Sequence, residues 1–242
     1  MQEVGGKARD MLLELLKKEP IVNYGFIKYL GKYEVKRSAV CGGSCAAVFG
    51  FGDEKFGALY SRDEGEARKV CKLFESITDL AIEPAFDWSI GAALGDRKPA
   101  NVLHAAMLYL PEAVMVGEPS GEVVDIGDEH TETVYANYAR AELVNRDYIR
   151  ERLSEGPAVG VFRDGALAGW AMTHDDMAMG MLTVLPEYRR QGIAYDMTLA
   201  LIRKMRQIGE VPIVHISKGN SMSLPLVRKL GFLEICDVMF IS

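Results

Sequence analysis

Residues 184–194 read VLPEYRRQGIA, and this stretch decides the fold. An apolar run, residues 179–185, ends at Pro186, and a short loop with two adjacent arginines leads to Gly192, where a helical pattern begins. A strand, a tight turn and a helix N-terminus in this order bring free backbone N–H groups together at the positive end of a helix dipole. Glycine lets an anion approach the backbone closely. The stretch therefore predicts a binding site for a diphosphate.

The residues after this loop set it apart from an ordinary strand-to-helix turn with solvated arginines. Apolar residues recur at helical spacing over residues 191–207, and residues 211–216 form a short apolar run typical of a strand. The sequence NSMS follows at residues 220–223 and KLGF at residues 229–232. The order along the chain is therefore loop, helix, strand, NSMS and KLGF.

This order resembles the GNAT acyltransferase superfamily, in which V-x-P-x-x-R-x-x-G-[IV]-[GA] is followed by N-x-x-S and K-L-G-F. The resemblance covers roughly residues 122–242 and implies acetyl-CoA, or another acyl-CoA, as cosubstrate. It implies that backbone groups of Leu182, Thr183 and Val184 bind the pantetheine arm and help to stabilise the oxyanion. The remaining cofactor contacts that it implies are Arg189, Arg190, Gln191, Gly192, Ile193, Ala194, Asn220 and Ser223.

A closer resemblance is to the glycine N-acyltransferase-like branch, in which a tryptophan precedes the loop proline by the distance from Trp170 to Pro186. It implies an α+β GNAT fold, a mixed and mostly antiparallel central sheet with flanking helices. We expect two tandem GNAT-like halves, a degenerate one over residues 1–118 and a catalytic one over residues 122–242. The first half has no equivalent of the 184–194 loop and should not bind CoA. An unrelated α+β domain is the alternative for it.

The local patterns predict the elements of both halves. In the first half, helices are expected over residues 8–18, 22–30 and 61–78, with a three-stranded meander over residues 35–60 that turns at Gly52-Asp53, and further elements at 88–94 and 102–110. In the second half, the expected order is strand 123–126, helices 131–141 and 146–154, a hairpin over 157–173, strand 177–185, helix 191–207, strand 211–216, helix 224–230 and strand 232–240. Because Pro225 would disrupt a helix capped at Asn220, we expect this helix to begin near residues 221–223.

The catalytic groups depart from the usual pattern. Amine attack on a thioester needs a neutral amine and a proton for the departing thiolate. Val227 occupies the usual tyrosine position, and Ala178 lies where the branch is expected to place a glutamate. We therefore rank His215 first and Asp176 second as the base, with an expected pKa of about 6–8 for the histidine. The alternatives are a core histidine, a polar turn at residues 173–176, and proton transfer to ordered water.

Charge and composition exclude some classes of binding partner. The net charge is −6 and the pI is near 5.4, which argues against a nucleic-acid partner. No apolar run is long enough for a membrane helix, and residues 1–6 lack the pattern of a signal peptide, so a cytoplasmic protein without membrane contact is expected. The four cysteines, Cys41, Cys45, Cys71 and Cys236, are expected in the core, and no metal is expected.

Three functions remain open at this level. The first is an N-acyltransferase, most simply an N-acetyltransferase, whose acceptor is a small-molecule amine or amino acid. The second is a CoA-binding protein without turnover, which Val227 and Ala178 favour. The third is a protein-modifying acetyltransferase. For the assembly, a homodimer is kept as an option.

Overall fold

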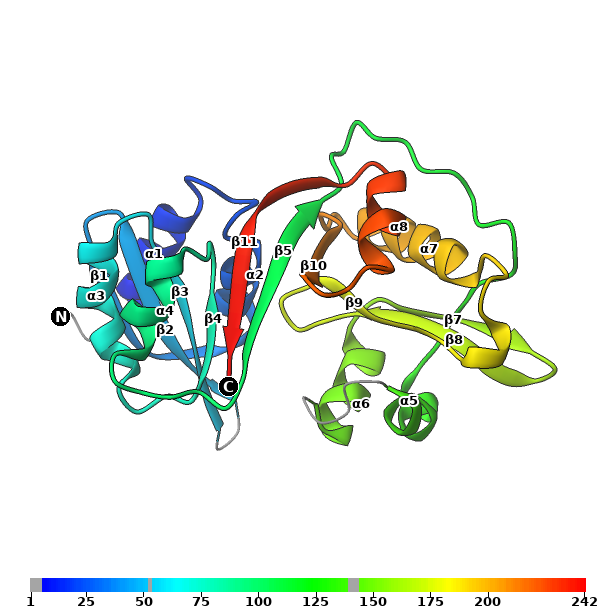
Figure 1. The fold of residues 1–242 in the computed structure, drawn as a ribbon, viewed down its shortest axis with the longest axis horizontal. Helices are drawn as coiled ribbons and strands as arrows, with labels where there is room; N and C mark the ends of the chain where they lie inside the picture. The colour runs from blue at the N-terminus through cyan, green and yellow to red at the C-terminus, as the bar shows by residue number, and fades with distance from the viewer. Residues whose placement is uncertain (1–5, 52–53, 139–143) are drawn as a thin grey trace. The chain divides into compact units, whose positions relative to one another are not determined.

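The computed structural model describes residues 6–51, 54–138 and 144–242, and the chain forms two compact units (Figure 1). The first unit extends to Leu108 and also contains Ile216–Ser221 and Glu234–Ser242. The second unit consists of Tyr109–His215 and Met222–Leu233. The units therefore differ from the predicted division into residues 1–118 and 122–242, because the chain returns twice to the first unit.

The first unit is an α+β layer structure built around a mixed sheet. Its strands run in the order β1-β2-β3-β4-β11-β5, with β3 and β4 parallel and the pairs β1/β2, β2/β3 and β4/β11 antiparallel. The predicted turn at Gly52-Asp53 lies outside the described residues. The elements are α1 (Gly6–Leu16), α2 (Tyr24–Lys32), β1 (Glu34–Cys41), β2 (Ser44–Phe51), β3 (Glu54–Tyr60), α3 (Glu64–Val70), η1 (Cys71–Phe74), β4 (Asp79–Ile82), α4 (Asp87–Leu94), β5 (Val102–Tyr109) and β11 (Leu233–Ile241).

The region after α3 differs from the sequence prediction. A single helix was expected to extend to about Thr78, but α3 ends at Val70 and continues as the 3-10 helix η1. The short strand β4 then pairs with β3, which the sequence pattern did not predict. The apolar residues at helical spacing do face the core, but the chain must turn after Phe74 to place Leu80 and Ile82 in the sheet. Tertiary packing therefore overrides the local helical pattern.

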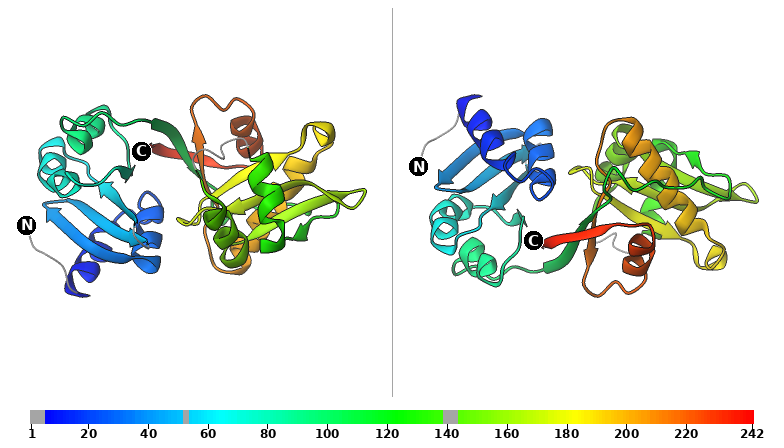
Figure 2. Two further views of the ribbon diagram at one scale, coloured as in Figure 1. Left: turned by 90° about the horizontal axis from the view of Figure 1, so that it is seen from below. Right: turned by 90° about the horizontal axis from the view of Figure 1, so that it is seen from above.

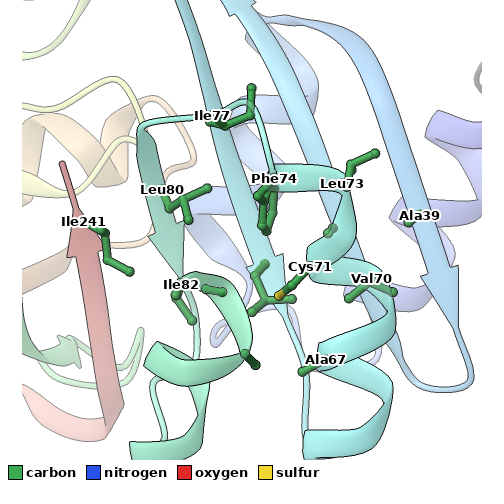
Figure 3. Close-up of a cluster of buried hydrophobic side chains, with 14 of the residues drawn as sticks. Ala39, Ala67, Val70, Cys71, Leu73, Phe74, Ile77, Leu80, Ile82 and Ile241 are labelled. Carbon is green, nitrogen blue, oxygen red and sulfur yellow. The ribbon is translucent and has the colours of Figure 1, made fainter. Parts of the chain in front are cut away.

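The C-terminal strand belongs to the core of the first unit. Met239 and Ile241 of β11 are 1% and 3% exposed and pack in the same cluster as Phe74, Leu80 and Ile82 (Figure 3). The backbone of β11 pairs with β4 from Met239↔Ile82 to Ile241↔Leu80. This packing explains why a strand predicted to complete the second half is part of the first unit.

The second unit contains the diphosphate loop in a sheet of order β10-β9-β8-β7-β6. The strands β6 to β9 are antiparallel, whereas β10 pairs with β9 in parallel at Val214 and Met179. The predicted helix over residues 131–141 was too long, because α5 ends at Asn137 and Tyr138 has an extended backbone; residues 139–141 lie outside the described residues. The elements are β6 (Val124–Asp125), η2 (Asp128–His130), α5 (Thr131–Asn137), α6 (Arg146–Glu155), β7 (Ala158–Arg163), β8 (Ala166–Thr173), β9 (Met179–Val184), η4 (Pro186–Tyr188), α7 (Ile193–Gln207), β10 (Ile213–Ser217) and α8 (Ser223–Lys229).

Two helical layers cover the sheet of the second unit. Helices α5 and α6 lie on one face and α7 lies on the other (Figures 1 and 2). On the α5–α6 face, Trp170 is completely buried and packs with Ile149 and Leu153 of α6. The turn between β7 and β8 has positive φ at both Asp164 and Gly165, as expected for a tight hairpin. Helix α8 begins at Ser223, which places Pro225 in its first turn, where no backbone hydrogen bond is lost.

One order of elements occurs twice along the chain. Residues 6–109 and the described part of residues 131–241 each contain two helices, three antiparallel strands, a helix, a strand parallel to the third of these strands, a helix and a final strand, which is β5 in the first range and β11 in the second. The N-terminal part thus repeats the order of elements found in the C-terminal part. Over the part of the chain that the structure describes, no helix is long and apolar enough to span a membrane.

The cysteines are free thiols, in line with the expectation of core residues for two of them. Cys45 and Cys71 are buried, whereas Cys41 and Cys236 are half-buried. Burial raises the pKa of Cys71 to about 12 and that of Cys236 to about 12. These thiols are therefore protonated at neutral pH and are poor nucleophiles.

Candidate functional site

The loop between β9 and α7 has the geometry of an anion site. Gly192 is the N-cap of α7 and has a φ of 81°, and Arg190 just before it has a φ of 64°. The first hydrogen bond that closes the helix runs from the Asp196 N–H to the Gly192 carbonyl, 3.0 Å apart. The preceding amides, those of residues 193–195, have no acceptor within the helix and point out of its N-terminus. They form the positive end of a helix of 15 residues.

The reason for the glycine differs in part from the sequence prediction. A Cβ at Gly192 would meet nothing within 4 Å, so the protein itself leaves open space above this position. The backbone needs glycine at position 192 because of the positive φ, which strains most residues other than glycine, asparagine and aspartate. The open space is what an anion near these amides would need. The loop therefore fits a diphosphate.

The loop residues differ in burial. Ile193 is 3% exposed and anchors the first turn, whereas Arg189, Arg190, Gln191 and Gly192 are exposed. The Arg189 Nε donates a hydrogen bond to the Val184 carbonyl (3.0 Å), which ties the loop to the end of β9. Arg190 is exposed beside the helix N-terminus, where its charge favours an anion.

A β-bulge interrupts β9 in the region predicted to bind the pantetheine arm. Trp170 pairs with Thr183 and Met172 pairs with Gly180, so Met181 and Leu182 oppose a single residue of β8. Met181 has a φ of 50°, which is unusual for a residue in a strand. A bulge releases backbone groups from the ladder and redirects them. The bulge makes this part of β9 suited to bind an extended ligand through its backbone, and the sequence pattern did not predict it.

The two ranked catalytic candidates lie together. His215 of β10 and Asp176, which precedes β9, are 3.5 Å apart between Nδ1 and Oδ2, and their side chains are 10% and 4% exposed. The other carboxylate oxygen of Asp176 accepts a hydrogen bond from the Ala178 N–H (2.8 Å). Burial lowers the pKa of His215, the Asp176 carboxylate opposes this shift, and His174 adds to it. The imidazole is therefore neutral at pH 7, as a base must be.

The turn that carries Asp176 is held by groups that the sequence analysis missed. The Tyr148 hydroxyl of α6 lies 2.9 Å from His174 Nδ1 and donates to Asp175 Oδ1 at 3.2 Å. Arg152, one helical turn further along α6, has a side chain that is 3% exposed, and its Nη1 lies 3.5 Å from the His174 carbonyl oxygen. Burial and the carboxylates of Asp175 and Asp176 raise the pKa of Tyr148 well above its ordinary value. No sign of this network is visible in the sequence, because it predicted a helix over residues 146–154 but not which groups Tyr148 would contact.

Both residues that stand where the family resemblance implies a proton-transfer group are buried. Val227 on α8 is 4% exposed and Ala178 is 1% exposed, so neither position offers a proton-transfer group. Ser223 is the first residue of α8, whereas Asn220 lies in the segment grouped with the first unit, and the cofactor contacts of both remain predictions. Tyr195 follows the loop and packs under Lys229, whose Nζ is 5.2 Å from the ring centroid.

The corresponding junction of the first unit, from β3 to α3, is already occupied by its own side chains. Asp63 caps α3 by accepting a hydrogen bond from the Glu66 N–H (2.8 Å), and the Ser61 Oγ accepts one from the Asp63 N–H (3.1 Å). Glu64 and Glu66 lie in the first turn. These carboxylates compensate the helix dipole and would repel a diphosphate. The second unit therefore carries the only one of these two junctions suited to an anion.

Comparisons with known proteins agree with this architecture. Residues 158–241 match the family described as FR47-like protein. The fold is that of the GNAT acetyltransferase superfamily: a GCN5-related N-acetyltransferase from Kribbella flavida is 14% identical over 92% of this chain and 94% of its own, with a TM-score of 0.63. A tandem GNAT protein from the clavulanic acid biosynthesis pathway is 17% identical over 98% of this chain and 94% of its own, with a TM-score of 0.54.

A Drosophila protein is similar over nearly the whole length. It is 16% identical, covers 99% of this chain and 97% of its own, and has a TM-score of 0.80. No curated protein sequence matches this chain. At these identities the similarity concerns the fold.

Proposed function

We propose that this protein is an acyl-CoA-dependent N-acyltransferase, most simply an N-acetyltransferase, acting on the amine of a small molecule or amino acid. The observation that carries the proposal is the helix N-terminus at Gly192, with positive φ, open space above it and Arg190 beside it. The glycine N-acyltransferase-like branch, the cytoplasmic location and the absence of a metal requirement belong to the same proposal.

The residues of the second unit would divide the work of such a reaction. The amides of residues 193–195 and Arg190 would hold the diphosphate, and backbone groups near the β9 bulge, at Leu182 and Thr183, would hold the pantetheine arm. The acyl-CoA supplies an activated thioester. The amine nitrogen attacks the thioester carbonyl carbon, a C–N bond forms, the C–S bond breaks, and the thiolate takes a proton from solvent.

His215 is the proposed base for the amine proton. Its burial keeps the imidazole neutral, and Asp176 stabilises the imidazolium that forms when the proton is accepted. This arrangement resembles the general logic of a base oriented by a carboxylate. It would replace the usual groups that Val227 and Ala178 do not supply.

A CoA-binding protein without turnover is the second candidate. Burial of Val227 and Ala178 at the two positions where proton-transfer groups are expected is the specific observation in its favour. The two candidates share the loop and differ only in chemistry.

One experiment separates them. The full chain is incubated with acetyl-CoA and a panel of amines, amino acids and lysine peptides, and free CoA thiol is measured against an acceptor-free control. Acceptor-dependent thiol release supports the transferase. Binding of acetyl-CoA without release by any acceptor, at protein concentrations that allow a single turnover to be seen, supports the second candidate.

A further inference from the structure

Residues 111–121, which we call the strap, run along α7 and are fixed to it at both ends (Figures 1 and 2). At the C-terminal end of α7, Arg206 donates hydrogen bonds to the Pro111 and Val114 carbonyls, both at 2.8 Å. At the N-terminal end, Asp196 accepts hydrogen bonds from the strap. Ten residues separate the two attachment points on α7, or about 15 Å along the helix axis.

The N-terminal attachment is dense. The two carboxylate oxygens of Asp196 accept from the Ser120 N–H (2.9 Å), the Ser120 hydroxyl (3.0 and 2.9 Å) and the Gly121 N–H (3.0 Å). Asp196 is only 7% exposed, and a buried carboxylate without such donors is costly. The strap therefore supplies the hydrogen-bond donors that compensate the burial of the Asp196 carboxylate.

Asp196 also lies next to the diphosphate loop. Its backbone N–H bonds to the carbonyl of Gly192, the residue with positive φ that opens the helix. The amides of residues 193–195, which face the proposed diphosphate, are in the same turn. A side chain that fixes this turn also fixes the direction of those amides, and donors around its carboxylate reduce its repulsion of a second anion.

We infer that Asp196 is a positioning residue, through which the strap holds the cofactor loop in its binding geometry. The inference rests on the proposed function, because it needs a ligand at that loop. Coupling between two sites is reciprocal, so a bound acyl-CoA must in turn stabilise the strap. The strap lies outside the strand, loop and helix that form the proposed diphosphate site, and none of its residues is among the proposed cofactor contacts.

The test compares variants at the two ends of the strap in the full chain. Asp196→Asn replaces one of the two accepting oxygens by an NH2 group, which cannot accept a hydrogen bond from the strap. We expect acetyl-CoA affinity, measured by calorimetry, to fall about tenfold. Ser120→Ala removes only the hydroxyl donor, and a fall of about threefold is expected. The matched control, Arg206→Met, breaks the distant attachment, and it should lower the melting temperature but change affinity by less than about twofold.

A second readout does not depend on substitution. Saturating CoA should slow hydrogen exchange of the Ser120 and Gly121 amides, although these residues lie outside the proposed contact set. Unchanged exchange at these amides, or equal affinity of wild type, Asp196→Asn and Ser120→Ala, would overturn the inference. An equal loss of affinity in Arg206→Met would show that general stability, not position, controls binding. If the wild-type chain binds no acetyl-CoA, the proposed function fails instead. If Asp196→Asn does not fold, Ser120→Ala and the exchange measurement decide.

Discussion

The pairing of His215 with Asp176 is the central observation at the scale of single residues. The sequence ranked these residues separately, and only the fold brings them to 3.5 Å. The sequence also led to an expected pKa of about 6–8, whereas burial lowers the pKa of His215 below its ordinary value. Burial is a property of the tertiary structure, because a histidine in a strand has no sequence signal for the groups that surround it.

This pairing predicts the acid limb of the pH–rate profile. The neutral imidazole is the active form, so kcat/KM should have its full value above the pKa of His215. It should decrease as the pH falls through that pKa, with an apparent pKa below about 6.5. Asp176 favours the imidazolium, so Asp176→Asn should move the limb to lower pH. His215→Ala should lower kcat by roughly 10²–10⁴ with little change in CoA affinity. A rate loss below about threefold in His215→Ala would return this residue to a structural role.

At the scale of elements, α6 supports the turn that carries Asp176. The Tyr148 hydroxyl contacts both His174 and Asp175, and the turn is closed by the His174 N–H on the Ala178 carbonyl (2.8 Å) and the Met177 N–H on the His174 carbonyl (3.0 Å). Gly180 of β9 contributes by lacking a side chain, because a Cβ there would lie 2.3 Å from His174 Nε2. Helix, turn and strand thus fix one another.

Tyr148→Phe tests this support because it removes the hydroxyl and keeps the ring. We expect the free energy of unfolding, measured with urea, to fall by about 0.5–1.5 kcal/mol, and kcat/KM to fall because Asp176 is less firmly held. Tyr135→Phe is the matched control, since Tyr135 packs in the same core cluster and its hydroxyl is outside this network. Equal effects of the two substitutions would show that the network has no special role.

The sequence predicted most elements because their signals are local. The hairpin turn at Asp164-Gly165, the start of α7 and the late start of α8 follow from turn residues, helical periodicity and Pro225. The end of α3, strand β4 and the β9 bulge were not predicted, because each depends on pairing with another strand. The loop was recognisable from its residues alone, whereas Tyr148 was not, because its partners are 26 and 27 residues away in the chain.

At the scale of the whole molecule, chain order and compact units do not coincide. β11 completes the first unit, and the strap begins at the start of the second unit, before the predicted boundary at residue 122. A strand leaving one half for the other has no local signature, because its apolar residues fit either core. The sequence therefore offered only local composition for the boundary, which was predicted between residues 118 and 122, beside Pro119 and Gly121.

These units predict which excised piece of the chain retains binding. Residues 109–233 include the strap and omit most of β11, whereas residues 122–242 lack Ser120 and Gly121 and leave Met239 and Ile241 without their core. We expect the first piece to unfold cooperatively and to bind acetyl-CoA more tightly than the second, by thermal melting and calorimetry. Equal binding and stability of both pieces would contradict the assignment of the strap and β11.

The central claim, that the loop at residues 184–194 binds the diphosphate of an acyl-CoA, is tested most directly by calorimetric titration of acetyl-CoA into three full-length proteins. Asparagine and aspartate both tolerate positive φ, so Gly192→Asn and Gly192→Asp differ mainly in charge. We expect wild type to bind one acetyl-CoA, Gly192→Asn to bind more weakly, and Gly192→Asp to bind more weakly still, because its carboxylate repels the diphosphate. No binding by the wild-type protein, or equal affinities of all three, would contradict the account.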